Sequence, residues 1–120
     1  MKELTESAEW LALQEHYEEI KDVHMRDMFE NDKVDGIFCV RGGYGVARMI
    51  RQINYDAIKA NPKVLVGYSD ITALHYAIYS QTGLVTFHGP VAVSTWNSFS
   101  YDYFKKLLFE SFLQFWHFRF

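Results

Sequence analysis

The chain has 120 residues, 49% of them hydrophobic and 22% charged, which suits one globular domain and excludes wholesale disorder. Its net charge of −3 offers no basic surface for nucleic acid or an anionic membrane, and its single cysteine, Cys39, excludes an internal disulfide and a four-cysteine zinc site. No apolar run is long enough to span a membrane and the N-terminus lacks the apolar stretch of a signal peptide, so we expect a cytoplasmic protein.

The first half of the chain predicts a helix, a strand and two short helices. Apolar side chains recur every three or four residues and predict a first helix from residue 10 to residue 30; they are Trp10, Leu13, Tyr17, Ile20, His24 and Met28. Residues 34–40 contain a continuous apolar run, typical of a parallel strand that is covered on both faces. A glycine-rich turn at 41–45 leads to a helix over 46–53, and Asn54 can cap a further helical turn over 55–60.

The second half predicts two more strands and two more helices. Residues 64–66 form a buried strand, a helix begins at Ser69-Asp70 and ends near Gln81, a third strand covers 84–87, and a last helix begins near Tyr101. This alternation predicts an α/β fold, a small parallel sheet flanked by helices on both sides. Since the chain opens on a helix and has only three predicted strands, we expect an incomplete domain of a larger protein.

The segment 112–120 is a tail that holds five aromatic residues and no turn signal. Such a stretch is sticky in water, so we expect the isolated chain to self-associate unless the tail packs on its own sheet. It is either a buried segment separated from its partner or a translation artefact. We therefore divide the chain into a partial α/β domain over 1–111 and a tail over 112–120.

Three segments follow predicted strands and should meet at one edge of the sheet, because ligands bind beyond the carboxyl ends of parallel strands. They are Arg41–Gly45, Gly67–Asp70 and Thr86–Pro90. The glycine-rich turn could cradle an anion with its backbone amides, although neither a dinucleotide fingerprint nor a Walker loop is present. A plain tight turn between a strand and a helix is the alternative.

Residues 64–70 have the form of a nucleophile elbow, in which an apolar strand, Gly-x-Ser and a helix follow one another. The helix N-terminus would bring backbone N–H groups to the place where an oxyanion forms. The alternative is that Ser69 is only the N-cap of the helix. None of the five histidines has metal-ligand spacing, and no complete Ser-His-acid set can be assembled, with His75 or His88 or otherwise.

Several of these motifs together resemble the LD-carboxypeptidase family of serine peptidases, which includes muropeptide LD-carboxypeptidases and microcin immunity peptidases. The matching segments occur in the family's order and spacing; they are Arg41–Gly45, Asn61–Lys63, Gly67–His75 and Gly83–Pro90. The resemblance covers roughly Arg26 to Pro90, we expect it to extend on to Glu110, and it is far more specific than an isolated elbow.

The resemblance implies that Ser69 is the nucleophile and that the backbone amides of Gly43 and Asp70 form the oxyanion hole. It implies cleavage of the terminal D-alanine from a murein tetrapeptide in cell-wall recycling, with no metal or cofactor, in a cytoplasmic homodimer. Arg41, Tyr44 and His88 are candidates for the substrate edge. An exopeptidase must bind the terminal carboxylate, usually through arginine or backbone amides, and Arg41 and Arg48 are near enough in sequence to do so; a surface or sheet-edge role for them is the alternative.

The chain also departs from the family pattern. The family's opening strand with its Ala-Pro-Ser-Gly type turn has no counterpart, and we expect the C-terminal domain, which carries the triad glutamate and histidine, to be absent. We therefore expect this chain alone to be inactive. Two other hypotheses stay open: a non-catalytic module that binds an anion or nucleotide through the glycine-rich turn, and a truncated gene product without function.

Overall fold

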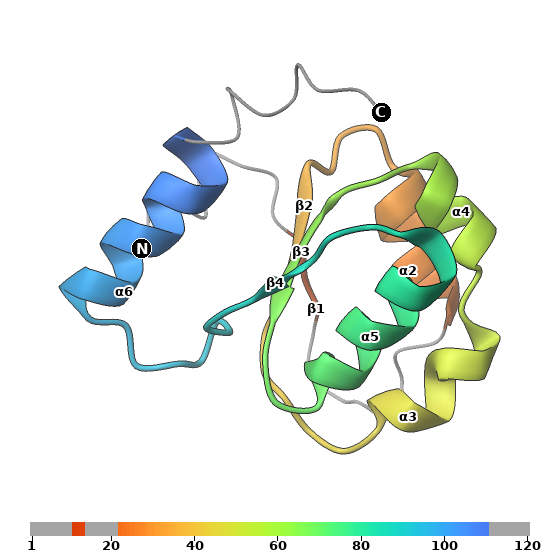
Figure 1. The fold of residues 1–120 in the computed structure, drawn as a ribbon, viewed down its shortest axis with the longest axis horizontal. Coiled ribbons are helices and arrows are strands. Elements are labelled where there is room, and N and C mark those ends of the chain that lie inside the picture. Colours follow the sequence, from red (N-terminus) through yellow and green to blue (C-terminus); the bar gives the residue numbers. More distant parts are fainter. Residues whose placement is uncertain (1–10, 14–21, 111–120) are drawn as a thin grey trace.

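The computed structural model describes residues 11–13 and 22–110, in which short strands alternate with helices (Figure 1). The strands are β1 (Leu11–Leu13), β2 (Gly36–Cys39), β3 (Val64–Gly67) and β4 (Phe87–His88). The helices are α2 (Asp22–Glu30), α3 (Val46–Met49), α4 (Tyr55–Ala60), α5 (Ile71–Thr82) and α6 (Ser98–Lys105). A 3-10 turn (Ile50–Gln52) extends α3, and a π-helical turn (Lys106–Glu110) extends α6. The predicted α/β fold class is confirmed.

All four strands form one parallel sheet in the order β1-β2-β3-β4. The register places Ile37 of β2 beside Leu65 of β3, and Gly67, the last residue of β3, beside His88 of β4. The carboxyl end of β4 is therefore level with the point at which the chain leaves β3 for α5.

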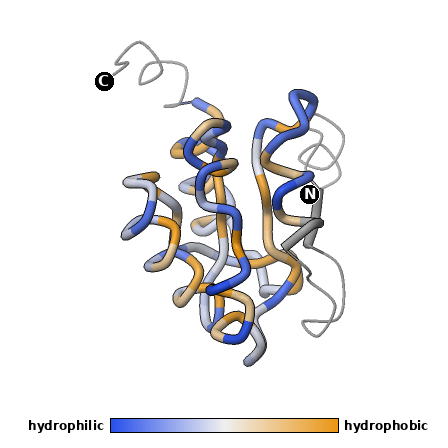
Figure 2. Tube along the Cα trace, turned by 90° about the vertical axis from the view of Figure 1, so that its right-hand side faces the viewer, coloured by the Kyte–Doolittle hydropathy of each residue, from blue (hydrophilic) through white to orange (hydrophobic). Residues whose placement is uncertain are grey.

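Both faces of the sheet are covered, as the apolar runs of the strands predict. In Figure 1, α2, α3, α4 and α5 lie on one side of the sheet and α6 lies on the other. Ile37, Cys39 and Leu65 face the four helices and join the larger core. Their neighbours in the strands face α6, where Val64 and Val66 pack with Phe104. Hydrophobic residues accordingly dominate the strands, whereas they alternate with polar ones along the helices (Figure 2).

The prediction that a helix begins at Trp10 is wrong over Leu11–Leu13, which form the edge strand β1. Residues 10–13 are four consecutive apolar residues. Apolar residues in such a run are one, two and three positions apart, so the run fits the periodicity of a helix and of a strand equally well. Parallel pairing with Ile37–Cys39 of β2 decides in favour of a strand. The predicted helix is confirmed over Asp22–Glu30, and its middle part, residues 14–21, lies outside the described residues.

The third predicted strand, over 84–87, is shorter and shifted, because β4 is Phe87–His88. The end of α5 explains the difference. Gly83 adopts a left-handed φ of 75° and its N–H donates to the Tyr79 carbonyl, and the N–H of Leu84 then donates to Thr82 Oγ1. The chain is thus still turning at Leu84 and reaches the sheet three residues later.

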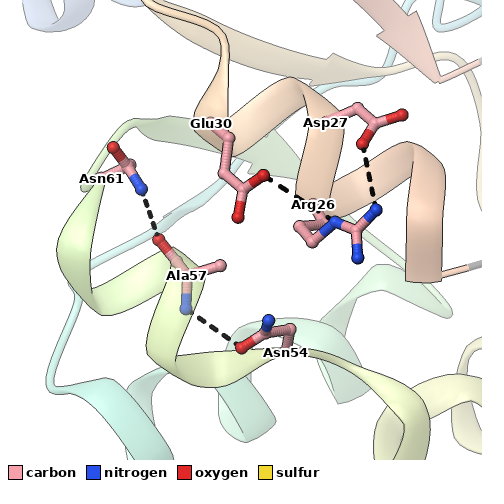
Figure 3. Close-up of polar contacts among 6 residues, drawn as sticks. All are labelled: Arg26, Asp27, Glu30, Asn54, Ala57 and Asn61. Carbon is pink, nitrogen blue, oxygen red and sulfur yellow. Dashed lines mark hydrogen bonds and ion pairs between the residues drawn. The ribbon is translucent and has the colours of Figure 1, made fainter.

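Side-chain caps account for two helix starts. Asn54 accepts a hydrogen bond from the Ala57 N–H at 3.1 Å and begins α4, as predicted (Figure 3). Asn61 Nδ2 donates to the Ala57 carbonyl at the other end of α4. Asn97 caps α6 in the same way through the Ser100 N–H, so α6 begins at Ser98 rather than near Tyr101. On neighbouring α2, Arg26 pairs with Asp27 and Glu30 (Figure 3).

Within residues 11–13 and 22–110, no helix is both long and apolar enough to cross a membrane. The aromatic tail over 112–120 lies outside the described residues, and the self-association expected of it stays a prediction.

Candidate active site

The turns that follow β2 and β3 lie side by side at one edge of the sheet, at the bottom of the ribbon in Figure 1. A Cβ atom at Gly42 would lie only 2.7 Å from the Cβ of Ser69, so the two turns are in direct contact. The end of β4 joins them, since the ring centroids of His88 and Tyr68 are 6.3 Å apart and the N–H of Gly89 donates to the Gly67 carbonyl at 3.1 Å. The predicted meeting of three segments at one edge is therefore present in the structure.

Ser69 has the backbone geometry of a nucleophile elbow. It follows the fully buried strand β3, it is exposed, and its φ of 64° is positive. A left-handed conformation costs a residue with a Cβ roughly 1–2 kcal/mol. Among the described residues that are not glycine, Ser69 alone has a positive φ. Among the described residues no N–H of α5 donates to Ser69 Oγ, and the N-cap position falls on Asp70, which favours the elbow over the alternative in which Ser69 only caps this helix.

Two glycines make room for this turn. At Gly67, a Cβ would lie 2.7 Å from Cγ2 of Ile71, so the last residue of β3 passes too close to α5 for any side chain. At Gly42, a Cβ would lie 2.7 Å from the Cβ of Ser69 and 2.9 Å from its Oγ. Neither position has a left-handed φ, so close approach alone requires a glycine at both.

The carboxylate of Asp70 connects the elbow to the neighbouring turn. Its Oδ2 accepts a hydrogen bond from the N–H of Val46 at 3.0 Å. Val46 is the first residue of α3, whose N-cap, Gly45, has no side chain to satisfy the free N–H groups at this helix start. Asp70 supplies that acceptor from a position 24 residues further along the chain.

His75, in α5, forms a hydrogen bond with the backbone of the elbow. Its Nε2 lies 2.9 Å from the Gly67 carbonyl, which can only accept, so Nε2 carries the proton. The same carbonyl accepts from the N–H of Gly89 at 3.1 Å. Burial lowers the pKa of His75 below its usual 6.5; the bond to Gly67 opposes this shift, and the nearby His88 adds to it. His75 is thus a neutral structural donor whose Nε2 is already in use.

The remaining predicted site residues lie in the glycine-rich turn and at the end of β4. Arg41, Gly43, Tyr44 and His88 are all exposed, and Tyr44 is 74% exposed although it is a large aromatic residue. Cys39 is buried and burial raises the pKa of its thiol to about 12, so it is no nucleophile. Among the described residues, no group of His, Cys, Asp and Glu could hold a metal ion.

The sequence predicts Ser69 as a site residue but gives no sign of the contacts around it. Gly42 lies against the serine, and the side chains of Asp70 and His75 make hydrogen bonds around the elbow. The only local sequence signal for the elbow is the spacing of Gly67 and Ser69. The other contacts join segments that are far apart in the sequence.

Comparison with known proteins agrees with this geometry. The sequence profile described as "LD-carboxypeptidase N-terminal domain" matches residues 6–89, which include the glycine-rich turn and the elbow. The chain belongs to the LD-carboxypeptidase family. The resemblance seen in the motifs is thereby confirmed.

Relatives of this family are much longer than the chain. A probable murein peptide carboxypeptidase of Bacillus subtilis is 47% identical over 74 residues, which are 62% of this chain and 23% of the relative. The murein tetrapeptide carboxypeptidase of Pseudomonas aeruginosa is 34% identical over 74 residues, 61% of this chain and 23% of the relative. The chain thus spans about a quarter of the length of these LD-carboxypeptidases.

A solved structure shows the same fold with a ligand. The microcin C7 self-immunity protein MccF of Escherichia coli is 36% identical over 88 residues, 68% of this chain and 26% of that protein. A structure of MccF in complex with glutamyl sulfamoyl guanosine superimposes with a TM-score of 0.68 at 33% identity, over 72% of this chain and 28% of that one.

Proposed function

We propose that this LD-carboxypeptidase segment carries the nucleophile of a serine carboxypeptidase that removes the terminal D-alanine from murein tetrapeptides. The observation that carries the proposal is the exposed Ser69 with its φ of 64° between β3 and α5. A serine that only shaped a turn would gain nothing from this strained conformation, whereas a nucleophile gains access to the substrate. The names of the two murein carboxypeptidase relatives support the choice of substrate.

The reaction begins when Ser69 Oγ attacks the carbonyl carbon of the residue before D-alanine and its proton passes to a general base. The oxyanion of the tetrahedral intermediate accepts hydrogen bonds from the N–H groups of Gly43 and Asp70. The C–N bond then breaks, the D-alanine amine leaves with a proton, and water hydrolyses the acyl-serine ester. In this proposal Arg41 pairs with the terminal carboxylate, and Tyr44 and His88 border the substrate.

The general base comes from outside the described residues, in keeping with the glutamate and histidine that the family resemblance assigns to a C-terminal domain. His75 does not take this role, because its Nε2–H donates to the Gly67 carbonyl. We therefore expect no carboxypeptidase activity from the 120-residue chain by itself. Loss of triad members lowers the rate by several powers of ten.

The alternative of a module that binds an anion at the glycine-rich turn has less support. The N–H of Val46, the first backbone donor of α3, is already occupied by the Asp70 carboxylate. A second anion there would compete with a carboxylate for the same donor and be repelled by it.

The test uses a chimeric enzyme, in which residues 6–89 of this chain replace the matching segment of the Bacillus subtilis relative. We expect the chimeric enzyme to release D-alanine from a murein tetrapeptide, and Ser69→Ala to abolish this release without a change in fold. Ser80→Ala is the matched control, because Ser80 lies exposed in α5 and donates only to the Ala77 carbonyl. A folded chimeric enzyme that releases no D-alanine, or an active Ser69→Ala variant, would refute the proposal.

A further inference from the structure

The Asp70 side chain forms a bridge between the two turns of the site. Its Oδ2 accepts from the Val46 N–H at 3.0 Å in a partly buried position. Within residues 22–110, no second hydrogen bond joins the turn 41–46 to the elbow 67–70. The relative position of the two turns thus depends on this bond and on apolar contact.

The apolar contacts resist closer approach but do not set the orientation of the turn. Val46 and Ile71, the residues that follow the two turns, are each 1% exposed and belong to the same core cluster. Gly42 lies against Ser69 but has no side chain that could interlock with it. Dispersion contacts of this kind are non-directional, whereas a hydrogen bond to a carboxylate is directional and roughly twice as strong as one between neutral groups.

This bridge connects the two donors of the proposed oxyanion hole. One donor is the N–H of Asp70 itself, and the other is the N–H of Gly43, which lies in the glycine-rich turn three residues before Val46. An oxyanion hole works when both donors lie 2.7–3.1 Å from the place where the oxyanion forms, so the distance between the donors has to be held.

We propose that Asp70 is a positioning residue, whose carboxylate holds the glycine-rich turn at the distance from the elbow that the oxyanion hole requires. The inference rests on the proposed function, and it gives the side chain a role separate from that of the backbone N–H. Replacing the side chain leaves that N–H in place, so the two roles can be tested separately.

The activity test compares Asp70→Ala with Asp70→Asn in the chimeric enzyme. The alanine variant loses the acceptor, and we expect kcat to fall about 10²-fold with KM changed less than about threefold, since misplacement by about 1 Å has this effect. Asparagine keeps an uncharged acceptor, and we expect it to restore kcat to within about tenfold of the parent.

Asn54→Ala is the matched control, because Asn54 also accepts from the N–H of a short helix, at 3.1 Å, but caps α4. We expect it to lower the melting temperature without changing kcat. If Asp70→Ala lowers the melting temperature in the same way and leaves kcat per folded molecule normal, Asp70 is only a cap and the proposal is wrong.

A second measurement does not depend on carboxypeptidase activity. In the 120-residue chain, amide hydrogen exchange of Val46 should accelerate at least about tenfold in Asp70→Ala, while Ala57 exchange stays unchanged. An unaltered Val46 amide in a folded Asp70→Ala chain would overturn the bridge itself. If instead the exchange result is as expected but Ser69→Ala stays active, the proposed function fails and the bridge between the turns remains.

Discussion

Gly42→Ala places a methyl group between the two turns of the site. The new Cβ would lie 2.7 Å from the Cβ of Ser69, 2.9 Å from its Oγ and 3.4 Å from the Tyr68 carbonyl oxygen. Carbon atoms are most favourably separated by about 3.5–4.0 Å, so the methyl group is roughly 1 Å too close to the serine. Since the φ of Gly42 is not left-handed, the backbone itself would accept alanine and the whole effect comes from this contact.

Both turns must shift to accept the methyl group, and overpacking of this kind costs about 1–3 kcal/mol of unfolding free energy. A shift of about 1 Å at Ser69 lowers turnover about 10²-fold. We therefore expect Gly42→Ala to lower kcat of the chimeric enzyme far more than its stability alone would explain. Gly83→Ala is the control, because it is strained by its φ of 75° but has no atom within 4 Å of the added Cβ. It should cost about 1 kcal/mol and leave kcat unchanged.

A double-mutant cycle in the 120-residue chain tests the contact directly, with urea denaturation as the assay. Ser69→Gly removes both atoms that the new methyl group would meet most closely. Gly42→Ala should therefore be destabilising beside Ser69 and nearly neutral beside Gly at position 69, with a coupling energy of about 1–3 kcal/mol. Additive effects of the two substitutions would refute the reasoning, and so would a chimeric Gly42→Ala enzyme of normal kcat.

Three further outcomes are expected. Gly43→Ala should lower kcat of the chimeric enzyme with little change in melting temperature; a large stability loss with normal turnover would show a purely structural glycine. Because burial lowers the pKa of His75 below its usual 6.5, the unfolded chain binds more protons and stability falls as the pH drops below about 6.5. His75→Gln should flatten this part of the curve in urea titrations. Asn54→Ala should cost the 120-residue chain about 1 kcal/mol in thermal denaturation, since the Ala57 N–H loses its acceptor.

The parts of the fold that could be predicted from sequence are those with local signals. The apolar runs before Arg41 and Gly67 predict strands buried on both faces, Asn54 predicts the start of α4, and Gly83 predicts the end of α5; the structure contains all four features. The strand at Leu11–Leu13 was missed because its pairing with β2 is a contact between distant segments. The same holds for the extent of β4, which is decided by its register with Val66.

The features of the site also fall into those with a local sequence signal and those that depend on contacts between distant segments. Gly67 and Ser69 lie two residues apart, so the elbow could be recognised from a short stretch of sequence. The bond from Val46 to Asp70 spans 24 residues, and the approach of Gly42 to Ser69 depends on how β2 and β3 pair. No local pattern encodes such contacts, and for that reason the sequence pointed to Ser69 but not to the residues that contact the elbow.

The strain at Ser69 is maintained by groups outside the elbow. A left-handed serine costs roughly 1–2 kcal/mol, and the turn would relax if it were free to do so. On the α5 side, the Ser69 carbonyl accepts from the Thr72 N–H at 2.9 Å, which fixes the peptide after the serine. On the strand side, the Gly67 carbonyl accepts from both His75 and Gly89, which fixes the peptide two residues before it. The backbone on both sides of the strained residue is thus held by hydrogen bonds, so its side chain projects from a fixed point of the turn, and its hydroxyl makes no hydrogen bond among the described residues.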